Sequence, residues 1–186
     1  MTIKKVLRMG HPTLRELAKP MSKEEILSDE TKELLQDMID TMEAEGGIGI
    51  AAPQIGISKQ VTLIAIDSEQ TRYEEAESTP LLVIFNPVIT TINEELQGFW
   101  EGCLSVPGLR GYVQRPKQVR IEYLDQHAKP QVIEPEGFLA TVFQHELDHL
   151  FGALYIDKIS DISKLSYIEE FEQFWLEPQE ETPPRE

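Results

Sequence analysis

The stretch PEGFLATVFQHELDHLF, residues 135–151, determines the centre of the fold, because its pattern predicts one amphipathic helix. Its apolar residues return every three or four positions, which places them along one side of a helix. They are Phe138, Leu139, Val142, Phe143, Leu147 and Leu150. We therefore predict a helix from about Pro135 to Phe151 whose apolar side faces the core.

Two more helices are predicted, one on each side of this stretch along the chain. Residues 29–45 carry an apolar stripe, with Ser28 or Asp29 able to cap the first turn and Gly46-Gly47 able to end the helix. Residues 162–175 carry a second stripe, formed by Ile162, Leu165, Ile168, Phe171 and Trp175. The sequence therefore predicts an N-terminal helix and a C-terminal helix.

Three β-type stretches lie between the first two helices, at residues 61–66, 81–89 and 119–124. They are apolar and β-branched or alternating, with Pro, Asn or Gly at their borders. A helix, then strands, then helices favours an α+β fold, because a doubly wound parallel sheet needs strands and helices to alternate. We expect antiparallel or mixed β-sheets packed around the helix of residues 135–151.

Length, charge and cysteine content narrow the class of protein. The chain has 186 residues, one cysteine and a formal net charge of −16. We expect residues 1–176 to form a single catalytic domain, and the acidic stretch EPQEETPPRE at 177–186 to be a disordered tail. One cysteine excludes an internal disulfide. The acidic charge disfavours direct DNA binding and membrane surfaces, and without a signal-like apolar run we expect a cytoplasmic protein.

The motif QHELDHL carries the clearest chemistry. His145 and His149 are four residues apart, so both imidazoles project from one face of the predicted helix and can reach one metal ion. Glu146 lies about 100° round the helix from His145, near enough to touch a water on that metal without being a ligand. A chance pair of histidines is the alternative, and the independently predicted helix argues against it. The sequence therefore predicts a metal-binding HExxH helix.

A catalytic metal site needs a third protein ligand, and the residues leave two candidates open. The zincin pattern HExxHxxGxxH has Tyr155 here in place of its third histidine. A downstream glutamate would then have to serve, and this alternative predicts a zincin-like endopeptidase that uses Glu169, Glu170 or Glu172. The other candidate is Cys103 in EGCLSVPG, where the neighbouring Gly and Pro-Gly indicate an exposed turn facing a cleft.

The glycine-rich stretch GGIGIAAPQIG, residues 46–56, is the third feature. It follows a predicted helix, so it does not fit a dinucleotide fingerprint, which follows a strand. Glycines here allow the backbone to approach a ligand closely, and the Gln54 amide can donate a hydrogen bond to an oxyanion. An ordinary loop at the end of a helix remains the alternative.

Taken together, GIGIAAPQ, EGCLS and QHELDH occur in an order and at separations that resemble the peptide deformylase family, which removes the N-formyl group from nascent bacterial proteins. The resemblance spans about residues 5–155. It implies that Cys103, His145 and His149 hold the metal and that Glu146 is the general base. It further implies that Gln54 and the backbone N–H of Leu104 stabilise the oxyanion, and that Gly49 and its loop pair with the substrate as an added strand.

The resemblance also implies the cofactor and the partners. It implies one Fe²⁺ per chain, with Zn²⁺, Ni²⁺ or Co²⁺ able to occupy the same ligands, and N-formyl-methionyl peptides as substrates. Candidates for the methionine pocket are Ile48, Phe138 and Val142, and candidates for supporting the Cys103 loop are Glu101 and Arg115. Some bacterial members dock on the ribosome by a basic C-terminal helix. Residues 162–175 are acidic, so we expect no ribosome association by that route.

Overall fold

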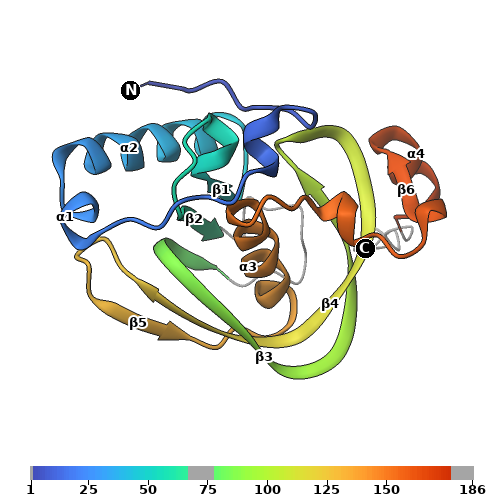
Figure 1. Ribbon diagram of the computed structural model, residues 1–186. Helices are drawn as coiled ribbons and strands as arrows, with labels where there is room; N and C mark the ends of the chain where they lie inside the picture. The colour runs from blue at the N-terminus through green and yellow to red at the C-terminus, as the bar shows by residue number, and fades with distance from the viewer. Residues whose placement is uncertain (1, 67–77, 177–186) are drawn as a thin grey trace, which may run out of the picture.

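The computed structural model describes residues 2–66 and 78–176, and every structural statement here refers to these ranges. Their fold is α+β, built on one six-stranded sheet in which every pairing of the strands is antiparallel (Figure 1). The strand order is β1 (Gly49–Ala51), β2 (Val61–Ile66), β3 (Thr79–Cys103), β4 (Val106–Leu124) and β5 (Pro130–Ile133), with β6 (Leu165–Tyr167) also beside β4. The antiparallel α+β organisation is thus confirmed.

Strands β3 and β4 form a long hairpin that curves around helix α3 (Gly137–Leu150), as Figure 1 shows. The pairing register between the two strands shifts at several places, and such irregularities increase local bending and twist. A two-residue turn, Leu104-Ser105, joins Cys103 to its partner Val106. The hairpin therefore delivers Cys103 to the inside of the curve.

The predicted strands at 81–89 and 119–124 covered only one end of this hairpin. Residues 88–92 and 94–96 of β3 are exposed, so they lack the half-buried alternation by which strands are recognised in a sequence. Their strand conformation comes from pairing with β4, which propensity does not report. The strand predicted at 61–66 has the bounds of β2.

The helices are α1 (Lys23–Ile26), α2 (Asp29–Ala44), α3 and α4 (Ile168–Phe174), with short 3₁₀ turns at Pro12–Arg15, Ala52–Ile55, Tyr155–Lys158 and Ile162–Lys164. The predicted cap of α2 is confirmed, because the Ser28 side chain accepts a hydrogen bond from the N–H of Thr31. The inner side of α2 buries Met38 and Met42 against Leu63 and Phe85 of the sheet.

Helix α3 is enclosed on nearly every side. Its Phe143, Leu147 and Leu150 pack with Ile64, Ile84 and Ile121 of the sheet in one buried cluster. Its polar Gln144, His145 and Glu146 are buried too, although the sequence pattern predicted burial of the apolar side alone. The curved hairpin explains this difference, because it closes over the side that a flat sheet would leave open.

The predicted C-terminal helix at 162–175 is corrected by the structure. Only Ile168–Phe174 is α-helical, because residues 165–167 pair as strand β6 with Leu109–Gly111 of β4. Hydrogen bonds to an available strand edge replace the helical bonds there. The predicted disordered tail at 177–186 lies outside the described residues.

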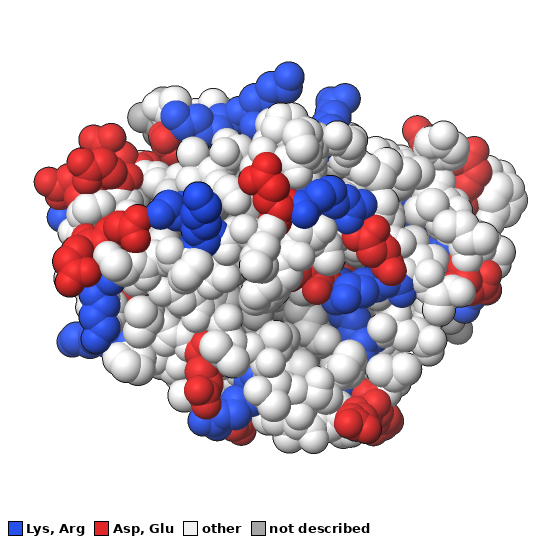
Figure 2. Space-filling view, in the orientation of Figure 1, with Lys and Arg blue, Asp and Glu red and all other residues white. Residues whose placement is uncertain are grey.

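Charge is unevenly spread over the surface. Figure 2 shows acidic side chains gathered at the end of the molecule that carries α1 and again near α4, and basic ones along the N-terminal segment at the top. This distribution agrees with the basic start of the sequence and with the glutamates of α4. Within the described ranges, none of the helices combines the length and the apolar character needed to cross a membrane.

Candidate metal centre

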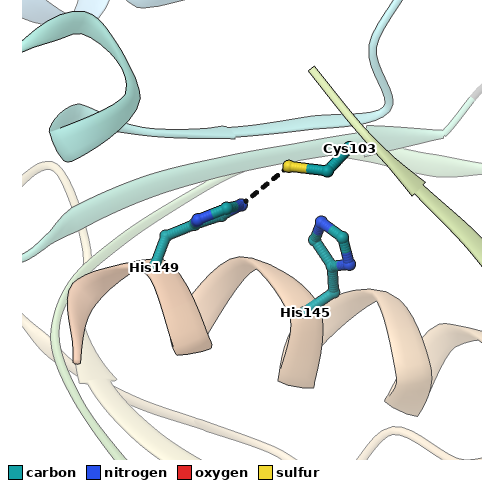
Figure 3. Close-up of side chains that lie close together, drawn as sticks. All are labelled: Cys103, His145 and His149. Carbon is teal, nitrogen blue, oxygen red and sulfur yellow. Dashed lines mark hydrogen bonds between the residues drawn. The ribbon is translucent and has the colours of Figure 1, made fainter. Parts of the chain in front are cut away.

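Three possible ligand atoms meet where the β3–β4 turn faces α3. The thiol of Cys103 and one imidazole nitrogen each of His145 and His149 all lie within 4.8 Å of one another. The Cys103 Sγ is 3.3 Å from the Nε2 of His149. Figure 3 shows the two histidines one turn apart on α3, with Cys103 reaching toward them from the end of β3. Of the two candidate third ligands, the structure brings Cys103 to the histidines.

The glutamates of the alternative lie elsewhere. Glu169, Glu170 and Glu172 are exposed on α4, and they do not belong to the group formed by Cys103 and the histidines. Tyr155, which replaces the third zincin histidine, instead stacks on the His145 ring, with the ring centroids 6.0 Å apart. It therefore packs behind the site.

A buried charge network orients His145. Its Nδ1 lies 2.7 Å from Oε2 of Glu101, which leaves Nε2 for a metal. Arg115 donates to both oxygens of Glu101, at 2.6 and 3.0 Å, and also to Asp148 at 2.8 Å. Glu101 and Arg115 are only 5% and 4% exposed, so these two sequence candidates form a buried pair. The network ties β3 to α3 directly behind the histidine.

Three ionisable groups of the site have shifted pKa values. Burial raises the pKa of Glu101, but His145 and Arg115 outweigh burial and lower it from 4.5 to about 2. Burial likewise raises the pKa of the Cys103 thiol, yet the His149 and His145 imidazoles hold it well below its ordinary value. Burial lowers the pKa of His145, and its contacts with Cys103 and Glu101 raise it well above the ordinary value. The lowered pKa favours the thiolate form of Cys103, which is the form that binds metal. The raised pKa favours the protonated form of His145, which must release a proton before its Nε2 can bind a metal.

Glu146 lies beside this group without joining it. Burial raises the pKa of its carboxyl, and among the described residues its Oε2 has no hydrogen-bond partner. The carboxyl also packs on β1, where a Cβ added to Gly49 would lie 2.5 Å from it. Gly49 is therefore required for close approach of the β1 backbone to Glu146.

Gln54 and the turn after Cys103 face the same point. The Gln54 Oε1 accepts a hydrogen bond from the N–H of Ala51 at 2.8 Å, so its Nε2 faces the turn after Cys103. There the Nε2 donates to the Ser105 Oγ at 3.2 Å and lies 3.6 Å from the Cys103 Sγ. The predicted turn at Cys103 is confirmed, but it is less exposed than expected, because Cys103 is half-buried and Ser105 fully buried. Leu104 lies in this turn.

The N-terminal segment holds these two loops together, which no motif predicted. The backbone N–H of Leu7 donates to the carbonyl of Gln54 at 2.7 Å, and the N–H of Met9 donates to the carbonyl of Ser105 at 2.7 Å. Both bonds use backbone groups, so side-chain identity at residues 7 and 9 carries no signal for them.

A cleft of about 980 Å³ opens onto the site. Its lining includes Ile48, Gly49, Phe138 and Val142 from the sequence candidates, together with Gln54, Leu104, His145 and Glu146. His149 and Arg115 do not line it and lie behind its wall. Sequence reasoning missed Trp100, Arg110, Thr141 and Ile168, which also line the cleft. Trp100 directly precedes the EGCLS motif, and this position was the one feature of the sequence that could have identified it as a cleft residue.

Comparison with known proteins places this geometry in a family. The sequence profile of the family described as polypeptide deformylase matches residues 3–165. A peptide deformylase from Leptospira biflexa is 40% identical over 172 residues, covering 92% of this chain and 96% of the relative. Peptide deformylase 1 from Nitrosomonas europaea is 44% identical over 165 residues, covering 89% of this chain and 92% of the relative.

A solved structure agrees with these sequence matches. The Met-Ala-Ser-bound class I type b peptide deformylase from Acinetobacter baumannii superposes with a TM-score of 0.81 at 37% identity, covering 85% of this chain and 99% of that chain. The chain is therefore a member of the polypeptide deformylase family.

Proposed function

We propose that this protein hydrolyses the N-terminal formyl group of formyl-methionyl peptides and releases formate. The observation that carries the proposal is the convergence of Cys103, His145 and His149 beside Glu146, whose Oε2 has no hydrogen-bond partner among the described residues. The Acinetobacter baumannii relative binds Met-Ala-Ser, a peptide that begins with methionine.

The donor set fits a divalent transition metal. One thiolate sulfur and two imidazole nitrogens suit Fe²⁺, Zn²⁺, Ni²⁺ and Co²⁺, and we propose one Fe²⁺ per chain as the native ion. The Nδ1 of His149 has no hydrogen-bond partner among the described residues, while its Nε2 faces the thiol. When bound, the cation supplies Lewis acidity and lowers the pKa of a water.

Glu146 moves the proton in the proposed reaction. Its carboxylate takes a proton from the attacking water as the oxygen bonds to the formyl carbon. The C–N bond then breaks, Glu146 gives the proton to the departing amine, and formate leaves. Burial raises the pKa of Glu146, which makes its carboxylate a better proton acceptor than an exposed carboxylate.

Two donors stabilise the negative charge on the formyl oxygen. The Nε2 of Gln54 is held in place by the bond from the N–H of Ala51 to its own Oε1, and the Leu104 N–H lies in the adjacent turn. Donors that are fixed before the reaction do not need to reorganise during it. We assign the oxyanion site to these two groups.

The peptide lies along β1 in this proposal. Among the residues that the structure describes, β1 pairs with β2 alone, and Gly49 lets its backbone approach Glu146 closely. An extended peptide can therefore add to the free edge of β1. The methionine side chain enters the part of the cleft lined by Ile48, Phe138 and Val142.

The test compares formate release from formyl-Met-Ala-Ser with cleavage of an unformylated peptide of similar length. We expect formate release and no peptide cleavage. Cleavage of internal peptide bonds without formate would instead support an endopeptidase.

The metal is tested separately by removing it and reconstituting anaerobically with Fe²⁺ or Zn²⁺. We expect the Fe²⁺ form to release formate faster and to lose that advantage in air, because a thiolate and a ferrous ion are both oxidisable. Equal, air-stable activity of the two forms would contradict the choice of Fe²⁺ and leave the ligand set intact.

A further inference from the structure

The C-terminal segment forms one wall of the cleft that contains the candidate metal site. Ile168, the first residue of α4, lines the same cleft as His145 and Glu146. Strand β6 positions it, because Ser166 pairs with Arg110 and Tyr167 pairs with Leu109 of β4. Figure 1 shows β6 and α4 beside the first part of β4, where β6 pairs with Leu109–Gly111. A segment far from every motif therefore contributes directly to the cleft.

The second component of this wall is Trp100 of β3. Its ring contacts three aromatic rings at centroid distances of 5.8 Å to Tyr112, 5.0 Å to Phe171 and 5.2 Å to Trp175. The interplanar angle is 67° with Tyr112, an edge-to-face contact of the kind that aromatic pairs prefer, and 51° with both Phe171 and Trp175. Tyr112 is also its direct partner across the strands. The indole is thus fixed in place before any ligand arrives.

Trp100 lies on the side of β3 opposite to the metal ligands. Glu101 contacts His145 and Cys103 contacts His149, so these two side chains point toward α3. Side chains alternate along a strand, so Trp100 and Gly102 point the other way. The position of Gly102 agrees, because a Cβ there would lie 2.0 Å from the guanidinium of Arg110.

The side chains of an extended peptide in the cleft also point alternately to opposite sides. Under the proposed function, on which this step rests, the first side chain points toward Phe138 and Val142 of α3. The second side chain then points away from α3, and Trp100 and Ile168 line the same cleft outside that helix. We propose that Trp100 and Ile168 form a subsite for the second residue of the substrate, and that this subsite favours an aromatic or large aliphatic side chain.

The chemistry of the wall supports that choice. Trp100 is half-buried, so part of its ring is available to a ligand, and Ile168 adds an aliphatic surface. An aromatic side chain placed on a fixed indole gains buried area and ring contact, whereas an alanine methyl reaches little of either. Trp100 is therefore a specificity-determining residue in this proposal.

The experiment measures kcat/KM for formyl-Met-Phe-Ser and formyl-Met-Ala-Ser. We expect the wild-type protein to prefer the Phe peptide about tenfold, mainly through KM, and the preference to fall to about onefold in Trp100→Ala. Phe174→Ala is the matched control, because Phe174 is an aromatic residue of the same helix that is 68% exposed. It should keep the preference.

A binding measurement on the wild-type protein keeps the test independent of variant folding. Trp100 and Trp175 are the two tryptophans of the chain, so intrinsic fluorescence reports on this wall. Titration with Met-Phe-Ser should change the emission at lower peptide concentration than titration with Met-Ala-Ser.

Equal kcat/KM values for both peptides in the wild-type protein, or a preference that survives Trp100→Ala, would overturn the subsite. So would equal concentration dependence in the two fluorescence titrations. Absence of formate from either peptide would instead refute the proposed function, so the two failures are distinguishable.

Discussion

Arg115 joins the two parts of the candidate metal centre through a single guanidinium. It holds Glu101 of β3 with two hydrogen bonds and Asp148 of α3 with a third. Glu101 in turn holds His145. A planar guanidinium with several fixed donors suits this position better than a lysine, which is a point charge on a flexible stem. The orientation of His145, a candidate metal ligand, thus depends on Arg115, which does not belong to the candidate ligand group.

Cys103 is the residue that separates the proposed ligand set from the zincin alternative. We expect Cys103→Ala to lose most of its bound metal and its formate release, because two imidazoles alone bind weakly. Glu170→Ala is the matched control and should keep both, since Glu170 is exposed on α4. Metal content by elemental analysis decides the matter, and an unchanged metal content in Cys103→Ala would remove Cys103 from the ligand set.

A variant of Glu146 distinguishes the two roles that this residue could have, a proton carrier or a metal ligand. We expect Glu146→Gln to keep one metal per chain and to lose turnover by at least about a hundredfold, because general acid–base catalysis contributes that much or more. Elemental analysis and formate release are measured on the same preparation. Loss of metal from this variant would show that Glu146 is a ligand.

At the scale of the elements, the 3₁₀ turn at Tyr155–Lys158 is tied back to the start of the chain. Asp157 pairs with Arg15, and its Oδ2 also accepts a hydrogen bond from the N–H of Leu154. Arg15 belongs to the first 3₁₀ turn, Pro12–Arg15. The chain after α3 therefore packs against the N-terminal segment that also holds the Gln54 and Ser105 loops.

This tie predicts a pH-dependent stability difference. Burial raises the pKa of Asp157, but Arg15 and the Leu154 N–H outweigh it and lower the pKa below the ordinary 3.8. A carboxyl whose pKa is lowered in the folded state adds to the free energy of unfolding above pH 3.8. This contribution is lost as the pH falls through the folded-state pKa. Asp157→Asn should therefore lower stability by no more than about 1 kcal/mol at pH 7, because the pair is partly exposed.

Urea unfolding of the wild-type protein and of Asp157→Asn checks this expectation at pH 7 and again at pH 3. The difference between the urea midpoints of the two proteins should be smaller at pH 3 than at pH 7. Glu16→Gln removes one charge from the same exposed segment and is the control. A gap that is as wide at pH 3 as at pH 7 would contradict a role for the Asp157 charge.

At the scale of the whole molecule, the net charge of the protein affects how readily a charged substrate reaches the cleft. The chain carries a formal charge of −16, and Glu43 and Glu45 line the cleft. Both lie at the C-terminal end of α2, where the helix dipole is also negative. Among the described residues of the lining, glutamates outnumber the one arginine, Arg110. A cleft with an excess of one charge attracts ligands of the opposite charge over distances at which salt screens the attraction.

We therefore expect opposite salt dependences for two C-terminally amidated substrates of equal length, whose net charges are +1 and −1. The kcat/KM of formyl-Met-Ala-Ser-Lys should fall as NaCl rises from low concentration to about 0.5 M, because screening weakens attraction. The kcat/KM of formyl-Met-Ala-Ser-Glu should rise over the same range, because screening weakens repulsion. Parallel salt curves for the two peptides would show that the molecular charge does not steer binding.

Local features of the sequence predicted the features that depend on local geometry. The spacing of His145 and His149, the cap of α2 and the bounds of β2 follow from periodicity and capping within a few residues. The order of the three short motifs also indicated the protein family. These features were readable because each arises from neighbours along the chain.

The tertiary structure alone decided the rest, because those features depend on contacts between distant residues. The length of β3 and β4 comes from their mutual pairing, and the strand at 165–167 exists because an edge of β4 was available to it. Backbone bonds from Leu7 and Met9 hold the Gln54 and Ser105 loops without any side-chain signal. A local pattern specifies which residues share a face. It does not specify which distant segment will pack against that face, and that packing placed Trp100 and Ile168 in the cleft.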